Sequence, residues 1–139
     1  MYKQMPRIYC NGVFDLCHIG HIKQFEQASK YGQVVVGVHS DEDVATYKRV
    51  PIQTTEERVE IVKNSKYVDQ VISNAPLITT LEFMKANQLD FILISPEYDS
   101  LTDHYYAEPR IAGKVIVGSR YPNMSTSLIV SRIKSRNDL

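Results

Sequence analysis

Short apolar runs alternate with helix-length amphipathic segments along nearly the whole chain. Short apolar runs bounded by turn residues are typical of buried strands. The run VVVGV, apolar at successive positions, is typical of a central parallel strand that is covered on both faces. We therefore expect strands at residues 8–13, 34–38, 68–73, 91–94 and 115–117.

The segments between these runs carry apolar residues at helical spacing. From 21 to 31 the apolar side chains share one face, and Gly32 follows as a stop signal. Thr54 and Glu57 form a capping pair at the start of a helix that runs to about residue 64. Further helices are expected at 41–47, at 80–87, at 105–112, where Pro109 weakens the pattern, and from Ser125 or Thr126 to about 133.

This alternation predicts an α/β fold, a doubly wound five-stranded parallel sheet of the Rossmann-like type with helices on both faces. Right-handed crossovers bring the carboxyl ends of the strands to one edge, where ligands bind. We therefore expect loops 11–21, 39–53 and 118–127 to converge on one site. Because no linker or repeat divides the sequence, residues 1–139 are expected to form a single domain, with 135–139 frayed.

Composition narrows the class of function. Hydrophobic residues are 43% and charged residues 23%, and 16 Lys and Arg balance 16 Asp and Glu. This balance does not favour nucleic acid as a partner. The sequence shows neither a signal peptide nor a membrane-spanning run, so we expect no integral membrane segment and a cytoplasmic protein. Cys10 and Cys17 could pair, but a reducing compartment favours two free thiols.

The H-x-G-H segment at 18–21 has the clearest chemistry. It stands where a helix begins after the first strand, and helix N-termini attract phosphates through free N–H groups and the helix dipole. The glycine lets the backbone come close, and His18 and His21 can donate hydrogen bonds to charge that develops at phosphorus. A zinc site from Asp15, Cys17 and the two histidines is the alternative, but the ligand spacing differs from that of zinc sites.

Two further loops on the expected ligand edge carry basic and hydroxyl side chains. Lys48 could bridge phosphoryl oxygens as a compact charge, although such a loop is also typical of a solvated surface. Arg120 can bind phosphate oxygens with two N–H groups. One of Ser125, Thr126 and Ser127 would satisfy the helix N-cap, so we interpret the three hydroxyls together as an anion site.

Asp15 and a group of tyrosines leave alternatives open. Asp15 could orient a histidine or cap a helix. Tyr98, Tyr105 and Tyr106 could fill an amphipathic surface, or they could form a wall for a cationic head group, because aromatic faces attract quaternary ammonium. The sequence does not separate these alternatives.

Four segments in this order resemble the cytidylyltransferases, a family within the nucleotidyltransferase superfamily. NGVFDLCHIGH at 11–21 resembles the opening signature, 51–71 resembles the middle block, and 74–76 and 120–129 resemble later blocks. The likeness is closest to the choline-phosphate and ethanolamine-phosphate enzymes. It implies a doubly wound fold, a homodimer, and the magnesium-dependent transfer of CMP from CTP to a phosphate monoester, with release of pyrophosphate.

The resemblance also implies roles for individual residues. Catalytic roles fall to His18, His21, Lys48 and Arg120. The implied nucleotide contacts are Val13, Phe14, Asp15, His18, His21, Lys48, Ser119, Arg120, Met124, Ser125 and Thr126. The implied acceptor contacts are Lys48, Leu77, Ser95, Tyr98 and Tyr105. Arg58 and the segment 67–69 match a part of the family that is tied to the dimer interface, and no residue is expected as a metal ligand.

At several positions the chain departs from the family's pattern. The R-T-x-G-I-S-T segment is RYPNMST at 120–126, the acidic pair after the fourth strand is Ser95-Pro96, and the tryptophan after N-A-P is Leu77. Glycerol 3-phosphate as acceptor and ATP as donor therefore stay open, as does a nucleotide-binding module without catalysis. A fragment of an aminoacyl-tRNA synthetase would be too short to add tRNA contacts.

Overall fold

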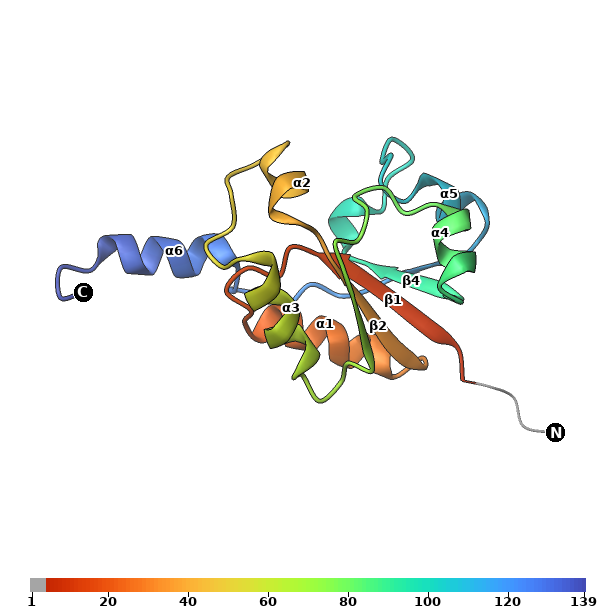
Figure 1. Cartoon of the computed structure of the whole chain (residues 1–139), viewed down its shortest axis with the longest axis horizontal. Coiled ribbons are helices and arrows are strands. Elements are labelled where there is room, and N and C mark those ends of the chain that lie inside the picture. Colours follow the sequence, from red (N-terminus) through yellow and green to blue (C-terminus); the bar gives the residue numbers. More distant parts are fainter. Residues whose placement is uncertain (1–4) are drawn as a thin grey trace.

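The computed structural model describes residues 5–139, so the first four residues of the predicted domain lie outside the described part. It contains a five-stranded sheet in the order β3-β2-β1-β4-β5, with every neighbouring pair parallel (Figure 1). The elements in chain order are β1 (Arg7–Gly12), α1 (Ile19–Ser29), β2 (Gln33–Val38), α2 (Asp41–Ala45), α3 (Thr55–Lys63), β3 (Gln70–Ser73), α4 (Leu81–Ala86), β4 (Phe91–Ile94), the 3₁₀ helix η1 (Pro96–Tyr98), α5 (Ala107–Ile111), β5 (Val115–Val117) and α6 (Thr126–Ser135). The predicted α/β class and its parallel sheet are confirmed.

Two local differences from the sequence-based expectations involve proline. Pro109 is the third residue of α5, within the first turn, where backbone N–H groups have no intrahelical partner, so the helix tolerates it. Residues 95–104, which lie between the expected strand 91–94 and the expected helix 105–112, contain the short helix η1 with Pro96 at its start. Proline's fixed φ is suited to that first helical position.

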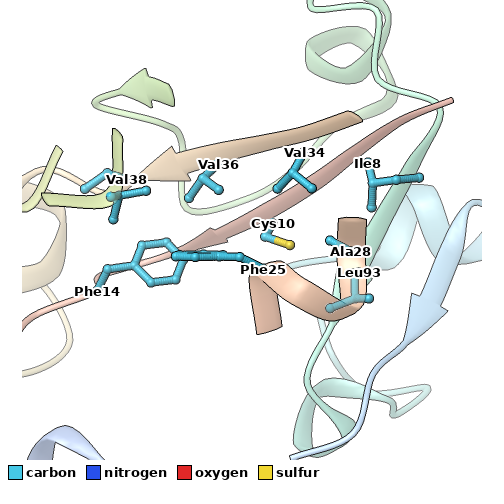
Figure 2. Packing of buried hydrophobic residues seen from close by; sticks show 10 residues of the cluster. Ile8, Cys10, Phe14, Phe25, Ala28, Val34, Val36, Val38 and Leu93 are labelled. Atoms are coloured by element: carbon cyan, nitrogen blue, oxygen red, sulfur yellow. The ribbon is translucent and has the colours of Figure 1, made fainter. Parts of the chain in front are cut away.

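Two apolar cores lie on opposite faces of the sheet. On one face, alternate residues of β1 and β2 pack with Phe25 and Ala28 of α1 (Figure 2). On the other face, Tyr9 and Val35 pack with Met84 of α4. Successive strand side chains point to opposite faces, so β1 and β2 supply both cores. This is why β2 is apolar at successive positions.

The order in which the chain adds strands to the sheet reverses between β1 and β4. The chain adds β2 and β3 on one side of β1, then crosses back to place β4 and β5 on the other. A crevice forms at the carboxyl ends of such strands, because the crossovers on the two sides leave in opposite directions. Gly12 at the end of β1 and Ile94 at the end of β4 both line a cavity there. The topology therefore places the candidate site.

The last helix, α6, extends away from the sheet (Figure 1) and has no fully buried residue. Of residues 135–139, for which we predict fraying, Ser135 is instead the last residue of α6, and 136–139 follow it and are exposed. Cys10 and Cys17 are free thiols, as expected. None of the helices within residues 5–139 combines the length and the apolar character that crossing a bilayer requires.

Candidate functional site

A cavity of about 600 Å³ opens at the carboxyl ends of β1 and β4. This volume lies in the range of small-molecule sites. Val13 from the loop after β1, Lys48 from the segment after α2 and Thr126 at the start of α6 all line it. The three loops that were predicted to converge therefore do meet at one cavity.

His18 and His21 form a capping box at the start of α1, in which each imidazole accepts one backbone N–H. The N–H of Gly20 donates to His18 Nδ1 at 3.0 Å, and the N–H of His18 donates to His21 Nδ1 at 3.2 Å. The two rings stack with centroids 3.8 Å apart, and Phe14 meets the His21 ring edge-on. Because each Nδ1 accepts a hydrogen bond, each neutral ring carries its proton on Nε2. The segment therefore supplies two Nε2–H donors in fixed orientation.

Burial keeps this pair neutral. The pKa of His21 is lowered to about 3, mainly by burial and by smaller amounts by the nearby His18 and Lys48. The negative charge of Asp15 raises this pKa and partly offsets the decrease. Burial also lowers the pKa of His18. Burial therefore favours the uncharged form of both rings, in which each imidazole donates one hydrogen bond.

The structure corrects the role predicted for Gly20. We expect from the sequence that its small size lets a phosphate approach the backbone. Instead, the His18 ring fills that space, because a Cβ on Gly20 would lie 2.8 Å from His18 Cε1 and 3.0 Å from Nδ1. The N–H groups of His18 and Gly20 already donate to imidazole nitrogens, so these two groups are not free to bind an anion.

Arg58 joins the loops beneath the cavity. Its guanidinium is fully buried and donates to the carbonyl oxygens of Val13 at 2.7 Å, His39 at 2.8 Å and Gln53 at 3.1 Å. It also pairs with the Asp41 carboxylate at 2.7 Å and holds the pKa of that group below its ordinary value. The resemblance ties Arg58 to a dimer interface, but the structure places it inside one chain, where it positions the loops.

Asp15 performs neither task predicted for it. Its carboxylate accepts the backbone N–H groups of Ile52 at 2.9 Å and Gln53 at 3.0 Å. Its carbonyl oxygen accepts the Thr126 hydroxyl at 2.9 Å. The N-cap of α1 is His18, not Asp15. Asp15 thus ties the three converging loops to one another, through partners that sequence spacing does not reveal.

The start of α6 uses two of its three hydroxyls for its own structure. Ser125 Oγ accepts the N–H of Leu128 at 3.0 Å as the N-cap, and Thr126 donates to Asp15. Ser127 lines the cavity and has no such structural task within residues 5–139. Ser127 is therefore the hydroxyl of these three that remains available for the predicted anion site.

Basic side chains from two loops lie at or near the cavity. Those after α2 line the cavity, and the one after β5 lies at its rim. Lys48 and Arg49 line the cavity, and burial lowers the pKa of Lys48. Arg120 does not line it, and its Nη1 lies 2.9 Å from Glu97 Oε2. Glu97 does line the cavity, so Arg120 is held at the rim by a carboxylate of the wall.

Tyrosines form one wall of the cavity. Tyr47, Tyr98 and Tyr106 line it, and the rings of Tyr98 and Tyr106 meet edge-on with centroids 5.6 Å apart. Tyr105 lies behind this wall, with its ring centroid 6.3 Å from that of Tyr98. The wall combines aromatic faces with phenol groups, which suits a ligand that is cationic at one end.

The predicted site residues divide into two groups. Those that line the cavity are Val13, Phe14, Asp15, His21, Lys48, Ser95, Tyr98 and Thr126. Those that do not are His18, Leu77, Tyr105, Ser119, Arg120, Met124 and Ser125. His18 stacks on His21, and the Ser119 backbone is held by both polar atoms of the Gln27 amide, at 2.8 and 2.9 Å.

Metal-ligating side chains do not gather in the described part of the chain. Within residues 5–139 no group of three or more His, Cys, Asp and Glu side chains could hold a metal ion. Of the carboxylates in the cavity wall, Asp15 binds backbone N–H groups and Glu97 pairs with Arg120. Both carboxylates of the cavity wall are therefore engaged within the chain.

A family model described as Cytidylyltransferase-like matches residues 9–132. The chain belongs to the cytidylyltransferase-like family. The ethanolamine-phosphate cytidylyltransferase of Mus musculus is 35% identical over 134 residues, which are 94% of this chain and 33% of that protein. The probable choline-phosphate cytidylyltransferase of Schizosaccharomyces pombe is 36% identical over 133 residues, 91% of this chain and 36% of that protein. The chain thus spans about a third of the length of these curated relatives.

A solved structure agrees with this assignment of the fold. The crystal structure of the lipopolysaccharide core biosynthesis protein from Thermoplasma volcanium has a TM-score of 0.70 and 26% sequence identity, and the likeness covers 84% of this chain and 98% of that one. The cytidylyltransferase-like chain therefore shares its α/β architecture with nearly the whole of that protein.

Sequence reasoning did not single out Asn11 and His39, which line this cytidylyltransferase-like cavity. Tyr106 donates its hydroxyl to Asn11 Oδ1 at 2.8 Å, and both line the cavity. His39, directly after β2, also lines it, and its Nδ1 lies 3.0 Å from the carbonyl oxygen of Ala75. A carbonyl oxygen only accepts, so Nδ1 donates and Nε2 is left as an acceptor. The sequence signal for Asn11 and His39 was their place at the carboxyl ends of neighbouring strands.

Proposed function

We propose that this chain transfers CMP from CTP to a phosphate monoester with a cationic head group, phosphocholine or phosphoethanolamine, and releases pyrophosphate. The observation that carries the proposal is the stacked pair of neutral histidines, with Nε2–H donors, beside a cavity at the reversal point of the sheet. The family membership and the names of the relatives supply the donor and acceptor classes. The tyrosine wall supports a cationic head group.

In this reaction an oxygen of the acceptor phosphate attacks the α-phosphorus of CTP. The new P–O bond forms as the bond to pyrophosphate breaks, in line with it. The acceptor is already ionised, so no side chain has to act as a nucleophile or remove a proton. Catalysis therefore rests on position and charge stabilisation.

The residues around the cavity divide this work. The Nε2–H groups of His18 and His21 donate to the non-bridging oxygens of the α-phosphate. Lys48 draws the two anionic substrates together. Arg120 and the start of α6, where Ser127 lines the cavity, hold the departing pyrophosphate.

We propose that Mg²⁺ enters with the triphosphate of CTP. The carboxylates of the cavity wall are engaged with the chain itself, and residues 5–139 contain no cluster of ligating side chains for the ion. No step above is assigned to the metal. We also propose that residues 1–139 act as one catalytic domain and associate as a homodimer, which the resemblance of 51–71 to the family supports.

The deciding experiment offers the purified chain each nucleotide with each acceptor. CTP or ATP is incubated with phosphocholine, phosphoethanolamine or glycerol 3-phosphate, and the products are identified by mass. We expect CDP-choline or CDP-ethanolamine together with pyrophosphate. CDP-glycerol, or product from ATP, would assign a different substrate. Calorimetric binding of CTP with no product from any acceptor would overturn catalysis and leave a binding module.

Gly20→Ala is expected to impair turnover much more than stability. The added methyl group would lie 2.8 Å from His18 Cε1, so the ring that caps α1 must move. Alanine has a higher helix propensity than glycine by about 1 kcal/mol, which offsets the weakened cap. We expect kcat to fall at least tenfold, or about 1.4 kcal/mol in activation free energy, while urea unfolding changes little. Lys23→Ala, on an exposed position of the same helix, is the control, and wild-type kcat in Gly20→Ala would contradict this role.

The fold is expected to lose stability on mild acidification. The pKa of His21 is about 3 in the folded chain against an ordinary 6.5, so between these values the unfolded chain binds a proton that the folded chain does not. The stabilisation is complete above the unfolded value and declines as pH falls below it, by about 1.4 kcal/mol per pH unit at most. Urea unfolding at neutral pH and near pH 5 measures this slope. His21→Gln should make it shallower; equal stability at both pH values in the wild type would contradict the assignment.

A further inference from the structure

Two acidic side chains, Asp15 and Glu97, lie in the wall of a cavity that also presents basic groups to its ligand. Glu97 belongs to η1, and its carboxylate accepts a hydrogen bond from Arg120 Nη1 at 2.9 Å. Lys48 and Arg49 are the basic residues of the wall. Among the carboxylates that line the cavity, Asp15 is fixed by two backbone N–H groups, whereas Glu97 is held by this one ion pair.

We propose that the Glu97–Arg120 pair is exchanged during binding and thereby couples the two substrates. The triphosphate takes Arg120, and the released Glu97 carboxylate receives the cationic head group of the acceptor. This inference rests on the proposed function and assigns the residue that selects the charge of the acceptor.

The ion pair is weak enough to be exchanged. The side chains of Arg120 and Glu97 are 68% and 48% exposed, and solvent screens such a pair. Exposed pairs of this kind change an equilibrium constant by no more than about fivefold. A guanidinium that binds phosphate oxygens with two N–H groups makes shorter and stronger hydrogen bonds. A triphosphate is therefore able to displace Glu97 from Arg120.

The released carboxylate stands beside the tyrosine wall. Glu97 directly precedes Tyr98, and the pKa of Tyr98 is raised by burial and then by the charge of Glu97. Aromatic faces attract a cation, and an adjacent carboxylate adds a full negative charge. While Arg120 neutralises Glu97, the wall lacks that charge. We therefore expect the acceptor to bind more tightly after the nucleotide has bound.

Glu97→Gln tests the exchange, and Asp99→Asn is the matched control because Asp99 is an exposed acid of the same loop. Binding is measured by calorimetry with CTP alone, and with phosphocholine in the absence and presence of a CTP analogue whose α,β-bridging oxygen is methylene. In the wild type and in Asp99→Asn the analogue should tighten phosphocholine binding. In Glu97→Gln this gain should vanish, CTP should bind about two- to fivefold more tightly, and the KM of the cationic acceptor should rise at least tenfold.

Arg120→Gln supplies the opposite perturbation. It frees Glu97 permanently, so phosphocholine binding should become independent of the analogue, while CTP binding weakens. Glycerol 3-phosphate, which has no cation, should show the same binding in the wild type and in Glu97→Gln.

Equal CTP affinity and equal coupling in Glu97→Gln and Asp99→Asn would overturn the exchange, even if CMP transfer continues. Absence of CMP transfer in the wild type would instead overturn the proposed function, and the calorimetric comparison of CTP binding would still decide whether Glu97 competes for Arg120.

Discussion

His18→Ala and His21→Ala are each expected to lower kcat for CMP transfer by about 100- to 1000-fold, the usual cost of removing one hydrogen-bond donor from a transition state. The two rings are stacked and neutral, and each presents an Nε2–H group because its Nδ1 accepts a backbone N–H. Removing either ring deletes one donor and also releases the other from the stack. Pyrophosphate release under saturating CTP and acceptor measures the loss.

The structural part of each histidine's role can be separated from its chemical part. His18 is the N-cap of α1, and loss of a cap costs about 1 kcal/mol of stability. His18→Asn keeps a side-chain acceptor at that position, so it should restore stability without restoring kcat. His104→Ala, at an exposed loop position, should retain wild-type turnover. Wild-type kcat in a folded His18→Ala or His21→Ala variant would refute the proposed chemistry.

Arg58→Met is expected to lower the free energy of unfolding by about 3–5 kcal/mol, because several acceptors lose the buried guanidinium that satisfies them, at about 1–3 kcal/mol for each buried group left unpaired. The methionine would leave the carbonyl oxygens of Val13, His39 and Gln53 without the donors that now satisfy them. A domain of this size has a total stability of about 5–15 kcal/mol. We therefore expect Arg58→Met to be barely folded, with a urea midpoint far below that of the wild type.

Arg58→Lys and Arg132→Met complete this comparison. Lysine keeps the charge but lacks the planar group that spans several acceptors, so Arg58→Lys should be intermediate in stability. Arg132 is exposed on α6, and its replacement should change the free energy of unfolding by less than about 0.5 kcal/mol. If Arg58→Met unfolds within 1 kcal/mol of the wild type, the role of Arg58 in holding the loops is wrong.

The sequence by itself determined the architecture and the place of the site. The apolar runs at 34–38 and 91–94 are strands because their residues face apolar cores on both sides of the sheet. Helix-period segments between the strands require parallel crossovers, and parallel crossovers place the loops after β1 and β2 at one edge. These features follow from local periodicity and chain direction, which a linear sequence contains.

Tertiary structure alone decided which side chains meet at that edge. Asp15 was expected to orient a histidine or cap a helix, yet its carboxylate holds the N–H groups of Ile52 and Gln53. Arg58 was tied to an interface by resemblance, yet it is buried beneath the loops of its own chain. Gly20 leaves room for the His18 ring and not for a phosphate. Each outcome depends on interatomic distances between residues that the fold brings together, or on the rotamer of a ring. The pattern of residue types along the sequence specifies neither the distances nor the rotamer.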